Sequence, residues 1–313
     1  MTLVKPPRLR KGDLIGLVSP ASTPSSTEKI EKGVRYLESL GYRTVVADHV
    51  RSVHGYLAGT DEERAGDFNG MIRDPKVKAI FALRGGYGTP RILSALDYRA
   101  LKRSPKIIVG YSDLTSLQLA VFRKCSLVSF SGPMVAVEMW NSIDPYTEEQ
   151  FWRLISSPKS PGVLPFPSDH QPTVLRPGRA RGRLMGGNLA LLIANMGTPY
   201  LPALKQCLLF TEDVDEAPHR VDRMFAQLRN AGVLSSIAGL LLGLFTECVP
   251  SDPSLPHLTI DQVLAELPDY TEGPILGNIP YGHVPRKLTL PLGVHARMDC
   301  SKRRLEILEG CVS

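Results

Sequence analysis

The chain has 313 residues, of which 43% are hydrophobic and 22% are charged, with a formal net charge of +6. This length can bury a large core and favours two domains, and the composition is typical of a soluble globular protein. The basic residues are dispersed without interleaved aromatic residues, which argues against nucleic acid as a partner and favours an enzyme that attracts an acidic substrate.

Apolar runs and cysteines bear on the cellular environment. The longest apolar run, residues 237–245, contains two glycines and is too short to cross a bilayer, and we expect no secretory signal at the N-terminus. The five cysteines include no Cys-x-x-Cys pair and favour reduced thiols. We therefore expect a cytoplasmic protein with no membrane partner.

Residues 1–140 alternate between strand and helix signals. Apolar runs predict strands at 14–18, 43–47, 77–83, 107–109 and 127–130. Amphipathic segments predict helices at 25–40, which Gly41 closes, at 61–72, which Asp61 caps, and after about residues 90 and 113. This alternation predicts a parallel, flavodoxin-like α/β sheet with ligands at the carboxyl ends of its strands.

Residues 141–178 are rich in proline and lose apolar periodicity after Ile155, which predicts an interdomain linker. Residues 179–313 are expected to form a second, mixed α/β domain. Its predicted strands are 207–210 and 239–245, and its predicted helices are 217–230 and 259–267. Three segments of the tail, 287–290, 294–298 and 304–308, predict short antiparallel strands.

The strand at 107–109 ends at Gly110, and Ser112-Asp113 then opens a helix. A strand, a sharp turn and a helix place the nucleophile of α/β serine hydrolases, although Leu114 stands where their second glycine would be. The alternative is that Ser112 or Asp113 only caps the helix. The sequence therefore makes Ser112 a candidate nucleophile.

A nucleophilic serine needs a base and a group that orients the base. Of the seven histidines, His283 lies in a Gly- and Pro-rich loop after the apolar Ile275-Leu276, a place where functional residues concentrate. Glu212 follows the predicted strand 207–210 directly and is the candidate orienting acid. The acidic run around Glu212 could instead favour the start of the next helix.

The segment Arg84-Gly85-Gly86-Tyr87-Gly88 follows the third strand. The backbones at Gly85 and Gly86, together with the Asp113 N–H, are candidates for an oxyanion hole. Alternatively, the glycines could hold a phosphate at a helix N-terminus. Arg84 could bind a substrate carboxylate or brace this loop through a salt bridge. No His, Cys, Asp or Glu cluster has the spacing of metal ligands, so no metal is expected.

Six motifs together resemble the LD-carboxypeptidase family of serine peptidases, which includes murein tetrapeptide carboxypeptidases and microcin C immunity peptidases. The resemblance covers nearly the whole chain. The motifs are Gly16-Leu17-Val18-Ser19-Pro20-Ala21, Leu83-Arg84-Gly85-Gly86-Tyr87-Gly88, Gly110-Tyr111-Ser112-Asp113-Leu114-Thr115, Gly182-Arg183-Leu184-Met185-Gly186-Gly187-Asn188-Leu189, Phe210-Thr211-Glu212-Asp213-Val214-Asp215-Glu216 and Gly277-Asn278-Ile279-Pro280-Tyr281-Gly282-His283.

The resemblance implies a Ser-Glu-His triad of Ser112, Glu212 and His283, with oxyanion donors at Asp113 and at Gly85 or Gly86. One departure is Ser131-Gly132-Pro133, where the family often has His-Gly-Pro; it bears on substrate contacts rather than on the reaction class. Because Ser112 lies in the first half and the other two residues in the second, the site is expected between the halves.

The activity implied is removal of the terminal D-alanine from murein tetrapeptide during cell-wall recycling, by a homodimer that needs no cofactor. Within the family, a peptidyl-nucleotide amidase of the microcin-immunity kind is the alternative. From another class, a non-catalytic module that binds a small ligand through Gly85–Gly88 also remains open.

Overall fold

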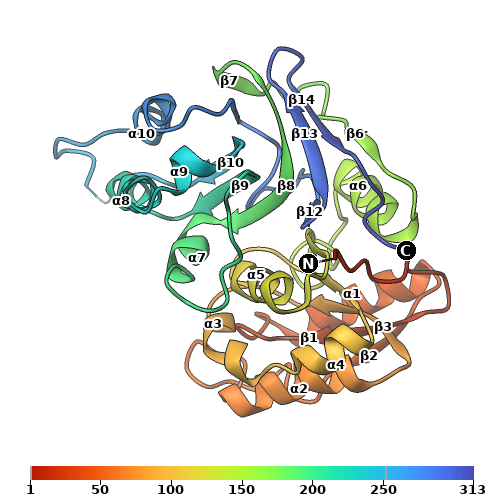
Figure 1. Cartoon of the computed structure of the whole chain (residues 1–313). Helices are drawn as coiled ribbons and strands as arrows, with labels where there is room; N and C mark the ends of the chain where they lie inside the picture. The colour runs from red at the N-terminus through yellow and green to blue at the C-terminus, as the bar shows by residue number, and fades with distance from the viewer. Residues whose placement is uncertain (1, 251) are drawn as a thin grey trace.

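The computed structural model describes residues 2–250 and 252–313, which form two β-sheets flanked by helices (Figure 1). The predicted α/β class is confirmed, with a largely parallel first sheet and a mixed second sheet. Among the described residues, no helix is both long and apolar enough to span a bilayer.

The first sheet has six strands in the order β12-β5-β4-β3-β1-β2. Its parallel strands are β1 (Leu14–Val18), β2 (Arg43–Val46), β3 (Val77–Ala82), β4 (Ile107–Val109) and β5 (Ser129–Ser131). The helices around it are α1 (Thr27–Ser39), α2 (Asp61–Arg73), α3 (Thr89–Ile92), η1 (Leu93–Ala95), α4 (Tyr98–Arg103) and α5 (Leu114–Cys125). The apolar runs that predicted the central strands are buried, as expected of strands covered on both faces.

Helix ends in this half follow local chemistry. Helix α1 begins after Ser26, whose side chain accepts a hydrogen bond from the Lys29 N–H. The cap of α2 was predicted one residue too late. Thr60, not Asp61, is the N-cap, because Thr60 and Glu63 form a reciprocal capping box.

The segment 141–178, predicted as a linker, contains regular structure: helix α6 (Pro145–Ser156) and strands β6 (Gly162–Leu164) and β7 (Thr173–Arg176). Proline is compatible with this helix because Pro145 occupies its first turn, directly after the Asp144 cap. Both strands join edges of the second sheet. The other prolines of this segment lie outside the helix and the two strands, so a high proline content is compatible with regular structure here.

The second sheet has eight strands in the order β6-β14-β13-β8-β9-β10-β11-β7. Its remaining strands are β8 (Arg179–Asn188), β9 (Cys207–Val214), β10 (Gly239–Thr246), β11 (Ile275–Gly277), β13 (His295–Asp299) and β14 (Arg304–Ile307). Strands β8 to β11 pair in parallel, and the outer pairs are antiparallel. Its helices are α7 (Leu189–Ala194), α8 (Pro218–Asn230), α9 (Val233–Ser236), α10 (Ile260–Ala265) and η2 (Leu267–Asp269).

The first tail strand lies later than predicted and in the other sheet. Strand β12 (Leu290–Leu292) pairs antiparallel with β5 at the edge of the first sheet. Pro291 is tolerated there because an edge strand has partners on one side only. The C-terminal half of the chain thus completes the sheet built by the N-terminal half.

A buried polar seam joins the two sheets. The Asn188 N–H at the end of β8 donates to Thr115 Oγ1 in α5 over 2.9 Å, and Asn195 Nδ2 donates to Ser116 Oγ over 2.6 Å. Helix α5 and helix α7 accordingly pack against each other between the sheets (Figure 1). This contact brings the carboxyl end of β4 beside the carboxyl ends of β8 and β9.

Candidate active site

Ser112 occupies the sharp turn between β4 and α5. Its backbone is left-handed, with φ of 64°, a conformation that is costly for a residue other than glycine. The Thr115 N–H donates to the Ser112 carbonyl over 2.9 Å and stabilises the turn. A serine held in this way at the end of a parallel strand has the geometry of a nucleophile elbow.

Helix capping does not account for Ser112 or Asp113. Asp113 stands at the N-cap of α5, yet its side chain makes no capping bond to that helix. Its carboxylate instead accepts hydrogen bonds from the N–H groups of Gly88 (3.2 Å) and Thr89 (2.8 Å). Within residues 2–250 and 252–313, Ser112 Oγ has no hydrogen-bond partner. The hydroxyl is therefore available for chemistry.

Glu212 and His283 are hydrogen-bonded to each other. Glu212 lies near the carboxyl end of β9 and is fully buried, and its Oε2 is 2.7 Å from His283 Nδ1. His283 lies in the loop between β11 and β12 and remains partly exposed. The preceding Gly282 has φ of +132°, and a Cβ there would lie 3.1 Å from Glu212 Oε2, so the close approach favours glycine.

The other oxygen of Glu212 faces Asn188, which the sequence presented only as part of a glycine-rich motif. Asn188 Nδ2 lies 3.4 Å from Glu212 Oε1 and 2.8 Å from Asp213 Oδ1. Burial raises the pKa of Asp213 to about 6. One amide thus links two neighbouring buried acids at the end of β9.

Ser112 and His283 line one cavity of about 530 Å³, together with Arg84, Gly85 and Gly86. The cavity lies where the carboxyl ends of the two sheets approach each other. Glu212 lies behind the cavity wall, bonded to His283. The structure therefore brings together the residues that the sequence nominated from both halves.

The backbone around Gly85 adjoins the Ser112 side chain. A Cβ at Gly85 would lie 3.1 Å from Ser112 Oγ and 3.5 Å from the Asp113 nitrogen. In the described part of the chain, the N–H groups of Gly85, Gly86 and Asp113 donate no hydrogen bond. These free donors next to the hydroxyl could stabilise a developing oxyanion.

The loop after β3 is braced by an arginine other than the expected one. Arg64, which is fully buried, donates from Nη1 to the carbonyls of Pro20 (2.6 Å) and Gly88 (2.9 Å). Arg84 forms no ion pair with any described residue, and its Nη1 makes one long bond of 3.3 Å to the Thr23 carbonyl. The Arg84 guanidinium can therefore receive an anionic group in the cavity.

Phosphate binding at this loop fits poorly. The N–H groups of Gly88 and Thr89, which start α3, already bind the Asp113 carboxylate.

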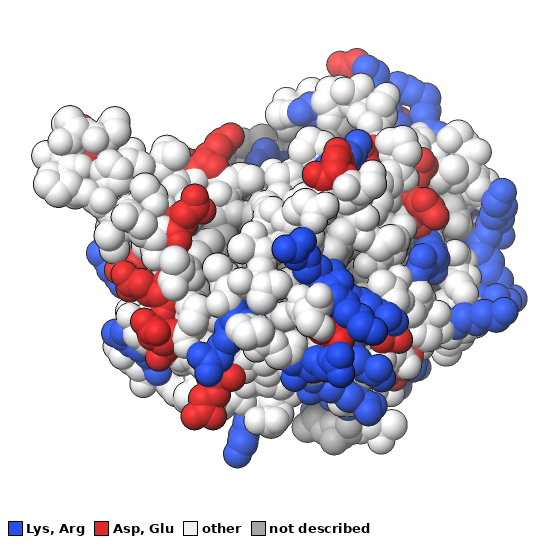
Figure 2. All heavy atoms as spheres, turned by 90° about the horizontal axis from the view of Figure 1, so that it is seen from above, with Lys and Arg blue, Asp and Glu red and all other residues white. Residues whose placement is uncertain are grey.

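Among the described residues, no three His, Cys, Asp or Glu side chains are arranged to hold a metal ion. On the face shown in Figure 2, acidic side chains lie between groups of basic ones.

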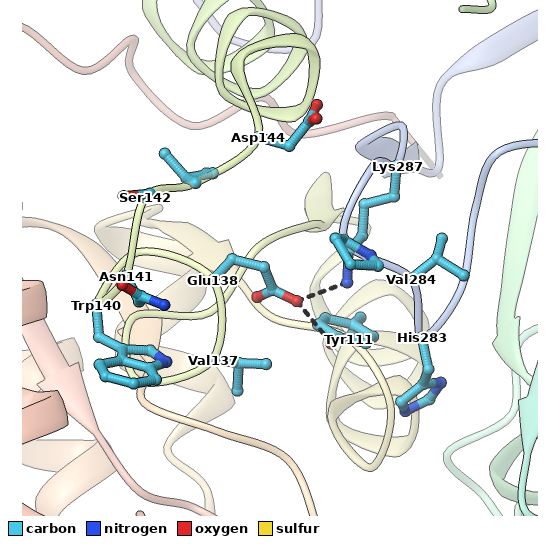
Figure 3. A pocket seen from close by; sticks show the side chains of 12 residues that line it. Tyr111, Val137, Glu138, Trp140, Asn141, Ser142, Asp144, His283, Val284 and Lys287 are labelled. Carbon is cyan, nitrogen blue, oxygen red and sulfur yellow. Dashed lines mark hydrogen bonds and ion pairs between the residues drawn. The ribbon is translucent and has the colours of Figure 1, made fainter. Parts of the chain in front are cut away.

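A second cavity of about 330 Å³ adjoins the first and shares Tyr111, Val137 and His283 with it (Figure 3). At its base, Glu138 binds both Lys287 and Tyr111. No sequence pattern pointed to Glu138 or Lys287, because a single charged residue in a loop resembles an ordinary solvated one.

Family models match both halves of the chain. Residues 15–132 match the LD-carboxypeptidase N-terminal domain, and residues 181–298 match the LD-carboxypeptidase C-terminal domain. The chain belongs to the LD-carboxypeptidase family. This LD-carboxypeptidase is a serine-type carboxypeptidase.

Relatives named as carboxypeptidases and relatives named MccF both match nearly the whole length of this LD-carboxypeptidase. The probable murein peptide carboxypeptidase of Bacillus subtilis (strain 168) is 36% identical and covers 98% of this chain and 95% of its own. The structure of MccF in complex with glutamyl sulfamoyl guanosine is 27% identical, with a TM-score of 0.90 and 99% of each chain covered. The muramoyltetrapeptide carboxypeptidase of Oxalobacter formigenes is 30% identical, with a TM-score of 0.80, and covers 94% of this chain and 97% of its own.

Proposed function

We propose that this LD-carboxypeptidase removes the terminal D-alanine from murein tetrapeptide in cell-wall recycling through a Ser112-His283-Glu212 triad. The observation that carries the proposal is the pairing of His283 with a fully buried Glu212 on the wall of the cavity that Ser112 lines. Cytoplasmic location, expected from the cysteine content, and a homodimeric state, expected from the resemblance, belong to the same proposal.

In the first step, Ser112 Oγ attacks the carbonyl carbon of the scissile amide while His283 Nε2 takes the hydroxyl proton. Glu212 accepts a hydrogen bond from the Nδ1 side of the ring, which fixes the tautomer and stabilises the imidazolium that forms. The N–H groups of Asp113 and of Gly85 or Gly86 stabilise the negative oxygen of the tetrahedral intermediate.

Collapse of the intermediate breaks the amide bond, and His283 returns the proton to the departing amine of D-alanine. Water, deprotonated by His283, then attacks the acyl-Ser112 ester; His283 returns the proton to Ser112 Oγ as the ester bond breaks, which releases the shortened peptide and restores the serine. Arg84, which forms no ion pair with the described residues and lines the cavity, binds the terminal carboxylate in this proposal.

A microcin-type conjugate is the second candidate substrate. The similarity to MccF, at a TM-score of 0.90, favours it. In that case the same acylation would release an amino-nucleotide analogue instead of D-alanine.

The experiment is direct competition between the two substrates. Purified enzyme is incubated with murein tetrapeptide and with a peptidyl sulfamoyl adenylate, and products are followed by mass spectrometry. We expect a higher kcat/KM for release of D-alanine. Cleavage of the adenylate alone would assign the enzyme to the immunity type, and cleavage of neither would contradict the proposed function.

A further inference from the structure

A buried ion pair that the proposed triad does not use lines the same cavity as the candidate base His283. Lys287 Nζ is 2.6 Å from Glu138 Oε1, and the two side chains are 2% and 8% exposed. The Tyr111 hydroxyl donates to the same carboxylate oxygen over 2.8 Å. The Met134 N–H donates to the other oxygen of Glu138, also over 2.8 Å, so the carboxylate is fully engaged.

Both members of the ion pair contact Tyr111. Lys287 Nζ lies 3.8 Å from the centre of that ring, in the geometry of a cation–π contact. Figure 3 shows Glu138 reaching toward both Lys287 and Tyr111, with His283 on the neighbouring loop. The ring is therefore held at its hydroxyl by Glu138 and over its face by Lys287.

Tyr111 in turn contacts His283. The ring centres are 5.0 Å apart, and the rings are inclined at 63°. The bond to Glu212 fixes one atom of the imidazole but leaves the ring able to tilt about that atom. A second contact, from Tyr111, restricts this tilt.

The position of the ion pair along the chain strengthens the connection. Tyr111 directly precedes Ser112, and Lys287 lies four positions after His283 in the same loop. Burial lowers the pKa of Lys287, whereas Glu138 raises it, which is the balance expected of a desolvated pair. A buried ion pair is by itself weak evidence for stability, and this one is connected to His283 through the Tyr111 ring.

We propose that Lys287 and Glu138 are positioning residues of the catalytic reaction, holding Tyr111 so that its ring fixes the orientation of the His283 imidazole. This rests on the proposed role of His283 as the base. Neither residue touches the reacting atoms. Their contribution passes through the Tyr111 ring.

The decisive variant is the double substitution Lys287→Met/Glu138→Leu, because apolar replacement of both partners leaves no orphan charge, although the Tyr111 hydroxyl and the Met134 N–H lose their acceptor. We expect kcat to fall about 10- to 100-fold, as misplacement of a catalytic group does, with KM little changed. In NMR spectra, the His283 Nδ1–H resonance should broaden. Tyr111→Leu, which leaves the ion pair intact, should lower kcat in the same way and provides a second route if the double variant folds poorly.

Lys106→Met is the matched control. Lys106 is another buried lysine, bonded to the carbonyls of Asp74 (2.8 Å) and Val77 (2.5 Å) just before β4, at the opposite end of the first sheet. We expect it to lose stability while keeping kcat. Folded double and Tyr111→Leu variants with wild-type kcat would overturn the positioning role, whereas retained turnover in Ser112→Ala would instead overturn the triad itself.

Discussion

Ser112 combines two features that rarely occur together without function. Its left-handed backbone costs on the order of 1–3 kcal/mol for a residue other than glycine. Its hydroxyl nevertheless makes no hydrogen bond with the described residues that would offset this cost. Backbone strain, together with a hydroxyl and neighbouring N–H groups that have no hydrogen-bond partner among the described residues, is expected of a nucleophile and not of a cap.

A substitution at Gly85 tests whether the backbone next to Ser112 takes part in the reaction. In Gly85→Ala, the new Cβ would lie 3.0 Å from Ser112 Cβ and 3.1 Å from Oγ, so the loop or the serine must shift. We expect kcat to fall by about 10²-fold, the scale of losing one oxyanion donor. The control is Gly66→Ala in α2, where a Cβ would meet nothing within 4 Å. Unchanged kinetics in Gly85→Ala would exclude this loop from the reaction.

A substitution at Arg84 tests whether its guanidinium binds the terminal carboxylate of the substrate. Lysine keeps the charge of Arg84 but loses the bidentate geometry that suits a carboxylate. In Arg84→Lys, kcat/KM for the free-acid tetrapeptide should therefore fall much more than kcat/KM for its C-terminal amide. Equal losses on the two substrates would place the carboxylate anchor elsewhere, since Arg64 already braces the loop.

Asp213 makes stability depend on pH. Because burial raises its folded pKa from 3.8 to about 6, the folded state holds the proton more tightly than the unfolded state. Its stabilising contribution is present below pH 3.8 and is lost as pH rises through 6. Relative to Asp213→Asn, the wild-type free energy of unfolding should fall across this window by at most about 3 kcal/mol in urea titrations. A difference that stays constant with pH would contradict this.

At the scale of elements, the site depends on where helix α5 meets strand β8 and helix α7. Asn188 and Asn195 both bind α5 side chains across this seam, but only Asn188 also reaches Glu212 and Asp213. Substituting each of the two asparagines can therefore distinguish a loss of stability from a loss of support for Glu212.

We expect Asn188→Ala to lower the free energy of unfolding by about 1–3 kcal/mol and to lower kcat about 10-fold, because Glu212 loses a partner. Asn195→Ala should lose similar stability, since it leaves Ser116 and the Leu191 carbonyl without their amide partner, and should keep kcat. Chemical denaturation and steady-state kinetics measure the two effects. Equal kcat values in Asn188→Ala and Asn195→Ala would show that Asn188 does not support Glu212.

The predictable elements were those with a local signal. Strands β1 and β4 are short apolar runs, and α1 has a serine cap and a closing glycine, so sequence alone located them. Strand β8 was missed because its glycines and arginines hide the strand pattern, although it pairs with both β9 and β13. Its place in the sheet comes from those partners and not from its own residues.

The same distinction holds for the site. Ser112 and Glu212 could be nominated because each lies at or just after the end of an apolar strand, and His283 because it lies in a Gly- and Pro-rich loop after the apolar Ile275-Leu276. Glu138 and Lys287 could not, because their contact spans 149 residues of sequence and neither has a distinctive local pattern.

At the scale of the whole molecule, the two halves are interlocked rather than merely linked. Strand β12 completes the first sheet, and the two ends of the chain lie side by side (Figure 1). There the Ser313 N–H donates to the Pro6 carbonyl and the Arg8 N–H donates to the Ser313 carbonyl, each over 2.9 Å. The cavity is lined by residues of both halves, including Ser112 and His283.

The most direct measurement is the turnover of Ser112→Ala on murein tetrapeptide, compared with wild type at matched folding. Removing a triad nucleophile should lower kcat about 10⁴- to 10⁶-fold while circular dichroism and the unfolding midpoint stay close to wild type. Turnover that remains within about tenfold of wild type, with a stability loss of about 1 kcal/mol as for a removed cap, would contradict the serine mechanism.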